Sequence, residues 1–110
     1  MTDDDKALMG DALRDALKRL DGWTAATRTA DGAEQTGLTR TFRFASFEDA
    51  MRFMAAAVPR IGEMDHHPEW TNVYDRVDVW LSTHSAGHRP TEKDVALAAH
   101  LDTLFANHAG

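Results

Sequence analysis

The stretch of sequence that decides the fold is residues 65–84, which read DHHPEWTNVYDRVDVWLSTH. Apolar side chains recur on one parity in its second half, at Val73, Val77, Val79 and Leu81. Alternation of this kind predicts extended chain with one buried face. Asp75 and Arg76 interrupt the pattern and predict a turn between a short strand and a longer one. We therefore expect two strands here, with a polar cluster before them and a histidine after them.

The polar cluster, residues 65–70, holds two adjacent imidazoles, two carboxylates and an indole. Histidine can give and take a proton near neutral pH. A buried imidazole needs hydrogen-bond partners for its ring nitrogens, so the adjacent pair His66 and His67 is unfavourable in a hydrophobic core. His84 ends the apolar run, where a side chain can leave the core and enter a cleft. The sequence therefore predicts a proton-handling site of three histidines.

The segments before this stretch predict a helix, a hairpin and a second helix. Apolar spacing over residues 3–20 predicts the first helix, capped by Thr2 with acidic residues in its first turn. Residues 23–30 and 35–44 flank Asp31-Gly32, which is typical of a β-hairpin. Within the second strand, Arg40 breaks the apolar parity, either as a rim residue or as one that faces a ligand.

The second and third helices have recognisable start signals. Ser46 precedes acidic residues and a wide apolar stripe, and Thr91 precedes Glu92 and Asp94 in the same way. Pro59 lies inside the second pattern, so we expect that helix to bend there or to end early, before His66.

The element order is helix, two strands, helix, two strands, helix, and it predicts an α+β fold. Hairpins imply antiparallel pairing, and amphipathic helices need one face of the sheet to cover. We expect residues 1–110 to form a single domain, a four-stranded antiparallel sheet with three helices packed on one face. Such a sheet has exposed edge strands, which makes dimerisation by edge pairing plausible.

Composition narrows the function classes. The chain has 110 residues, 43% of them hydrophobic, no cysteine and a formal net charge of −6. Disulfides, thiolate metal sites and a cysteine nucleophile are therefore excluded. The charge argues against binding to nucleic acid or to an anionic membrane. An acidic N-terminus and the lack of an apolar run of bilayer length predict a soluble cytoplasmic protein.

Other interpretations of the histidines stay open at this point. Three histidines with nearby carboxylates are able to bind zinc, although adjacent histidines are poor ligand spacing because their rings diverge. A structural role as satisfied surface or core residues is the better interpretation for His88, His100 and His108, each taken alone. A nucleophilic role for Ser82 or Ser85 beside His84 lacks a glycine-rich elbow or an oxyanion signature.

The sequence also resembles a known family. Residues 65–70, then Asn72-Val73-Tyr74, then Leu81-Ser82-Thr83-His84, then Asp94 opening a helix, are similar to the pterin-4a-carbinolamine dehydratases. Residues 40–44 and Phe47 agree with the same family, as does the order of elements. The resemblance covers nearly the whole chain after the first helix.

The resemblance implies a reaction and roles for particular residues. The family dehydrates 4a-hydroxytetrahydropterin, which aromatic amino acid hydroxylases produce, to quinonoid dihydropterin in the recycling of tetrahydrobiopterin. It uses no metal and no cofactor, since the pterin is the substrate. The catalytic residues would be His66 and His84 as the acid/base pair and His67 as a pterin-orienting residue that shares the proton work. The substrate-binding residues would be Asp65, Trp70 and Asp94.

The family also suggests an alternative, non-catalytic role. Some animal members serve as dimerisation partners of a homeodomain transcription factor through the second helix, and a few relatives help to assemble other enzymes. A homodimer or homotetramer is expected in either case. Two departures from the family pattern are Gly62, at a position that is usually polar, and the loop at residues 87–90, which is longer than in some relatives.

Overall fold

The structure, a computed structural model, describes residues 6–108. Its helices are α1 (Gly10–Lys18), α2 (Phe47–Met64) and α3 (Glu92–His108), with a short 3-10 turn, η2 (His84–Ala86). Its strands are β1 (Thr24–Ala30), β2 (Ala33–Arg43), β3 (Glu69–Val73) and β4 (Arg76–Leu81). Across residues 6–108, none of the helices combines the length and the apolar character that crossing a membrane requires.

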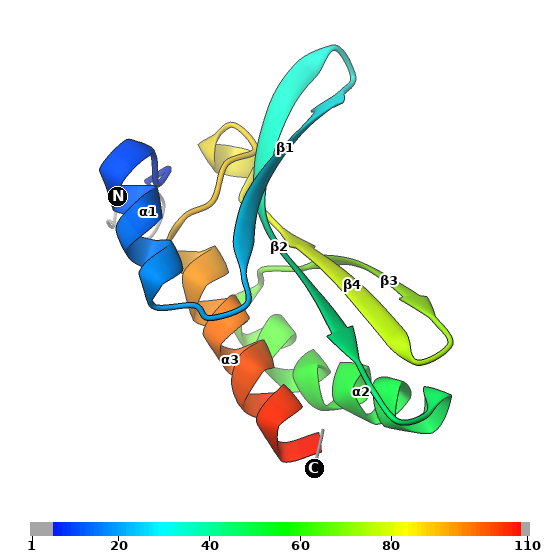
Figure 1. The fold of residues 1–110 in the computed structure, drawn as a ribbon. Helices are drawn as coiled ribbons and strands as arrows, with labels where there is room; N and C mark the ends of the chain where they lie inside the picture. The colour runs from blue at the N-terminus through cyan, green and yellow to red at the C-terminus, as the bar shows by residue number, and fades with distance from the viewer. Residues whose placement is uncertain (1–5, 109–110) are drawn as a thin grey trace.

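The four strands form one antiparallel sheet in the order β1-β2-β4-β3. Asp31 and Gly32 join β1 to β2 with φ values of 53° and 78°, the left-handed pair that a tight hairpin turn requires. The three helices lie on one side of the sheet, and α2 and α3 pack against each other (Figure 1). The predicted fold class and element order are confirmed.

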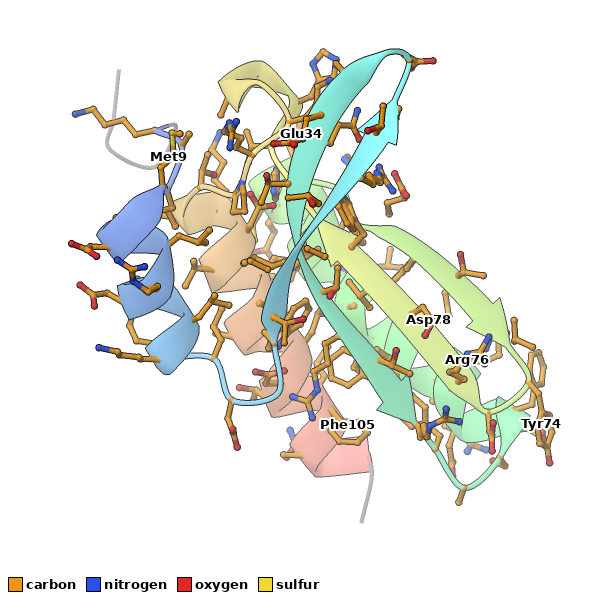
Figure 2. All side chains as sticks on the ribbon, turned by 45° about the horizontal axis from the view of Figure 1, so that its top comes forward. Met9, Glu34, Tyr74, Arg76, Asp78 and Phe105 are labelled. Carbon is orange, nitrogen blue, oxygen red and sulfur yellow. The ribbon has the colours of Figure 1, made fainter. Side chains whose placement is uncertain are left out.

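The core lies between the sheet and the helices and is centred on Phe42 of β2, which is fully buried. Its ring centroid is 4.9 Å from that of Phe53 on α2 and 5.0 Å from that of Phe105 on α3. Phe105 points from α3 toward the strands, whereas Tyr74 lies at the far tip of the β3–β4 hairpin (Figure 2). The apolar parity of β4 meets this core, because Val77, Val79 and Leu81 are all buried.

The Arg40 side chain is bonded within the protein and also lines a cavity beside Thr39 and Trp80. Its Nη1 donates to Asp102 Oδ1 at 2.7 Å, and its guanidinium carbon lies 4.5 Å from the ring centroid of Phe42. Trp23 Nε1 donates to the same carboxylate oxygen at 2.8 Å. Burial raises the pKa of Asp102, while the hydrogen bond from Trp23 and the charge of Arg40 act in the opposite direction. This group ties α3 to β2 and to the start of β1.

The first helix begins later than the sequence predicts. Met9 occupies the position before it, and helix α1 starts at Gly10. The backbone N–H of Leu8 donates to the carbonyl of Pro90 at 2.7 Å, and the Leu8 side chain packs against the core. This tertiary contact takes the segment before Gly10 away from helical geometry. The predicted cap at Thr2 and the acidic first turn lie outside the described residues.

Helix α2 starts as predicted, because the Ser46 hydroxyl accepts a hydrogen bond from the N–H of Asp49 at 3.1 Å. It does not end at Pro59 but continues to Met64, which agrees with the expected limit before His66. Pro59 and Ala55 are both exposed. The carbonyl group that loses its partner to proline is therefore on the solvent side of the helix, where water can bond to it.

On the open face of the sheet, Trp80 lies between Gly37 and Arg28. A Cβ atom on Gly37 would come within 2.3 Å of the Trp80 ring. The guanidinium carbon of Arg28 is 4.1 Å from the Trp80 ring centroid, and Arg28 bonds to both carboxylate oxygens of Glu69 at 2.6 and 2.8 Å. The hydrogen bond and charge of Arg28 lower the pKa of Glu69. Only glycine at position 37 leaves room for the Trp80 ring.

We predict that Gly37→Ala lowers the free energy of unfolding by about 1–3 kcal/mol, the usual cost of overpacking. Urea denaturation followed by circular dichroism measures it. The control is Gly62→Ala in α2, where an added Cβ meets nothing within 4 Å. Alanine there stabilises by about 0.5–1 kcal/mol, because it favours helix over glycine. Equal stability of Gly37→Ala and the unaltered protein would contradict the described packing.

Candidate active site

The end of helix α2 determines where His66 lies. Asp65 follows the helix in the left-handed conformation, with φ of 48°. The N–H of Asp65 donates to the carbonyl of Gly62 at 3.2 Å, and the N–H of His66 donates to that of Ile61 at 3.4 Å. This ending satisfies the last carbonyl groups of the helix. The chain turns sharply, and the His66 ring reaches the start of α3.

The His66 ring contacts the carboxylate of Asp94, a residue that is fully buried. The Nε2 atom of His66 is 2.6 Å from Asp94 Oδ1. The other oxygen, Oδ2, accepts the Thr83 hydroxyl at 2.7 Å and the backbone N–H of Thr91 at 2.8 Å. An ionised carboxylate only accepts hydrogen bonds, so it requires the proton on Nε2 of His66. That leaves Nδ1 of His66 as the nitrogen able to exchange a proton with a ligand.

The hydroxyl groups around Asp94 have a defined direction. The N–H of Lys93 donates to Thr91 Oγ1 at 3.2 Å. The hydroxyl groups of Thr91 and Thr83 are 2.8 Å apart, and Thr83 gives its proton to Asp94. Thr91 must therefore donate to Thr83. Because Thr83 directly precedes His84, the same carboxylate holds the ring of one histidine and the backbone attachment of the other.

His84 begins the η2 turn and is exposed. Its ring contacts the ring of His88 at a centroid distance of 4.3 Å and an interplanar angle of 77°. His88, expected from the sequence to be an isolated surface or core histidine, instead contacts a predicted catalytic residue. The turn is closed by Thr83, whose N–H donates to Arg89 at 3.0 Å and whose carbonyl accepts the N–H of His88 at 3.1 Å.

The remaining predicted residues are nearby in sequence but form no hydrogen bond with Asp94 in the part of the chain that the structure describes. His67 and Asp65 are exposed. Trp70 on β3 is half-buried and packs against the core, so only part of its ring is available to a ligand. The structure thus joins His66, Asp94 and, through Thr83, His84. The roles predicted for His67, Asp65 and Trp70 stay predictions.

The described residues contain no preformed metal-binding site. Across residues 6–108, no group of three or more His, Cys, Asp or Glu side chains is arranged to hold a metal ion. The nearby carboxylate Glu69 is already bonded to Arg28 on the open face of the sheet. The sequence-based expectation of a metal-free site stays a prediction.

Two residues of the site were not identified from the sequence. Thr83 and Thr91 were placed only as part of a motif and as a helix cap, respectively. The signal for Thr91 is its spacing to Asp94, since a hydroxyl residue followed three positions later by an acidic one forms a capping box. Thr83 carries no comparable signal, because its contact depends on how β4 meets α3.

A cavity of about 470 Å³ lies elsewhere, with lining residues that include Thr39, Thr71 and Trp80. None of the predicted catalytic residues lines it. Its carboxylates already have partners, since Glu69 bonds to Arg28 and Asp78 accepts the Thr41 hydroxyl. Size alone marks this cavity as a ligand site, whereas the groups able to move protons are at the junction of α2, β4 and α3.

We predict that Asp94→Ala lowers the free energy of unfolding by about 3 kcal/mol, because it removes the shared acceptor of three donors, two of them buried and the His66 ring largely so. Thermal or urea denaturation measures the change. Glu92→Ala is the matched control, since Glu92 is also acidic and in the first turn of α3 but forms an exposed ion pair with Arg19. Its loss costs about 0–1 kcal/mol. Similar losses in the two variants would contradict the network.

Comparison with known proteins places the chain in one family. Residues 6–104 match the family described as pterin 4 alpha carbinolamine dehydratase. A Paraburkholderia xenovorans protein, provisionally named as such a dehydratase, is 46% identical over 90 residues, covering 82% of this chain and 86% of the relative. A similarly named Burkholderia ambifaria protein is 41% identical over 100 residues, covering 91% of each chain.

A solved structure agrees with these relatives. The crystal structure of a transcriptional coactivator/pterin dehydratase from Brucella melitensis is similar with a TM-score of 0.78 at 39% identity, covering 96% of this chain and 100% of the other. The two proteins are therefore similar in sequence as well as in fold over nearly their full length. The chain belongs to the pterin 4 alpha carbinolamine dehydratase family.

Proposed function

We propose that the protein catalyses the dehydration of 4a-hydroxytetrahydropterin to quinonoid dihydropterin and water. The observation that carries the proposal is the contact between His66 and Asp94, with His84 tied to the same carboxylate through Thr83. The names of the relatives support the same reaction class, a hydro-lyase.

The chemistry matches what imidazoles can supply. The bond between C4a and the hydroxyl oxygen breaks, and that oxygen takes a proton from one imidazole and leaves as water. The lone pair of N5 forms the new double bond to C4a, and the proton of N5 passes to a second imidazole. Two proton transfers balance the reaction, so it needs no electron acceptor. General acid and base groups of this kind contribute about 10²–10⁴-fold each.

His66 and His84 are the proposed acid/base pair. The Asp94 carboxylate fixes the ring of His66, with Nδ1 as its free nitrogen, whereas His84 extends from a turn into solvent. His67 orients the pterin and shares the proton work. The family resemblance supports this role of His67. It also supports the contributions of Asp65 and Trp70 to the pocket.

The proposed setting follows from the substrate. A 4a-hydroxytetrahydropterin is produced when an aromatic amino acid hydroxylase turns over, so we infer that such a hydroxylase supplies the substrate. The product then requires a separate reduction before reuse. We place this recycling step in the cytoplasm, and we expect no cofactor and no metal to take part.

A second candidate function is a protein-binding role for the surface of α2. Phe47 and Val58 on this helix are 41% and 58% exposed, although the rest of its apolar stripe is largely covered. The Brucella melitensis relative is described as a transcriptional coactivator as well as a dehydratase. A homodimer or homotetramer that uses this surface would occupy it, so a large measured assembly would weaken the adaptor role.

We predict that the protein accelerates the decay of freshly generated 4a-hydroxytetrahydropterin in stopped-flow absorbance. His66→Ala and His84→Ala each reduce the catalysed rate by about 100-fold or more, because each removes one proton carrier. His100→Ala is the histidine control, since His100 lies on α3 and contributes nothing to the Asp94 network, and its rate stays within about twofold.

Circular dichroism confirms that the variants fold. Rates near that of the unaltered protein in both His66→Ala and His84→Ala would overturn the assignment of the acid/base pair. No acceleration by the unaltered protein would overturn the dehydratase function and leave the α2 surface as the feature to test.

A further inference from the structure

We propose that His88 is a positioning residue that holds the His84 ring in the orientation needed for proton transfer. The proposal rests on the dehydratase function for its kinetic consequence, because the His84 orientation matters to the rate only if His84 moves a proton. No role was expected for His88 from the sequence, and it belongs to the loop at residues 87–90.

The two rings form a close edge-to-face pair. Their centroids are 4.3 Å apart and their planes cross at 77°. Edge-to-face contact is a preferred geometry of aromatic pairs, since the positive edge of one ring meets the negative face of the other. His84 is exposed, and its ring has no hydrogen bond in the described part of the chain. The His88 ring is therefore what restrains it.

The backbone of His88 is fixed in an uncommon conformation. Its φ of 57° lies in the left-handed region, which is unfavourable for residues other than glycine and is found where surrounding contacts enforce it. Its N–H donates to the carbonyl of Thr83 at 3.1 Å, and its carbonyl accepts the N–H of Thr36 at 3.0 Å. Hydrogen bonds to β2 and to the segment that follows β4 thus hold the backbone that carries the ring beside His84.

The need for such a restraint follows from the difference between the two histidines. His66 is oriented by a buried carboxylate 2.6 Å away. Among residues 6–108 no carboxylate bonds to His84, which stands at the start of a three-residue turn capped by Gly87. An exposed ring on a short turn would occupy several rotamers, and a misplaced catalytic group costs rate. His88 supplies the restraint that a carboxylate supplies to His66.

Two variants distinguish the contribution of the His88 ring from that of the His88 backbone and from any proton transfer by the His88 nitrogens. His88→Asn removes the ring but retains a residue that tolerates positive φ. His88→Phe retains an aromatic ring but has no ring nitrogen. We expect kcat of His88→Asn to fall about two- to tenfold, the factor that an aromatic pair of ordinary strength corresponds to, with KM within about twofold. We expect His88→Phe to recover most of the kcat.

A second readout does not depend on activity. In proton NMR, the His84 ring signals carry a ring-current shift from His88, and His88→Asn should remove it. Thermal unfolding shows whether both variants fold.

Unchanged kcat in folded His88→Asn, or an equally slow His88→Phe, would overturn the proposal. If the unaltered protein does not accelerate the dehydration, the proposed function fails on its own. In that case the NMR comparison alone tests whether His88 restrains the His84 ring. Unchanged His84 signals in His88→Asn would contradict the restraint.

Discussion

The buried carboxylate of Asp94 joins three segments that are distant in sequence. It accepts hydrogen bonds from the ring of His66 after α2, from the hydroxyl of Thr83 after β4, and from the backbone N–H of Thr91 before α3. A buried charge without such partners costs several kcal/mol, on the order of a large part of the stability of a small domain. The folded chain must therefore bring these segments together, and the candidate site is built where they meet.

The sheet topology makes this meeting possible. Strand β4 is central, between β2 and β3, and Thr83, which follows it, reaches Asp94 at the start of α3, where His66 also arrives from the end of α2. Asp94 also completes the capping box of α3, because its carboxylate accepts the N–H of the capping residue Thr91 three positions earlier. The same side chain thus serves helix formation and the orientation of His66. Stability and activity are expected to depend on it together.

The sequence predicts the fold well because local signals agree with the packing: the alternation in β4, the Asp31-Gly32 turn, and the cap at Ser46. It places the start of α1 wrongly, because the hydrogen bond between Leu8 and Pro90 is a tertiary contact that local periodicity cannot reveal. The pairing of His66 with Asp94 was not predicted, because the family resemblance implied Asp94 only as a substrate-binding residue. The contact of His84 with His88 was missed because it depends on a backbone conformation of positive φ that histidine rarely adopts.

The central claim is that pterin binds at the junction of α2, β4 and α3, and not in the cavity beside Trp80. A crystal structure of the protein soaked with 7,8-dihydropterin, a stable analogue of the reaction product, tests it most directly. We expect the pterin ring next to His66 and His84, with Nδ1 of His66 facing it. A pterin ring bound instead among Thr39, Thr71 and Trp80 would contradict the claim and move the site to the open face of the sheet.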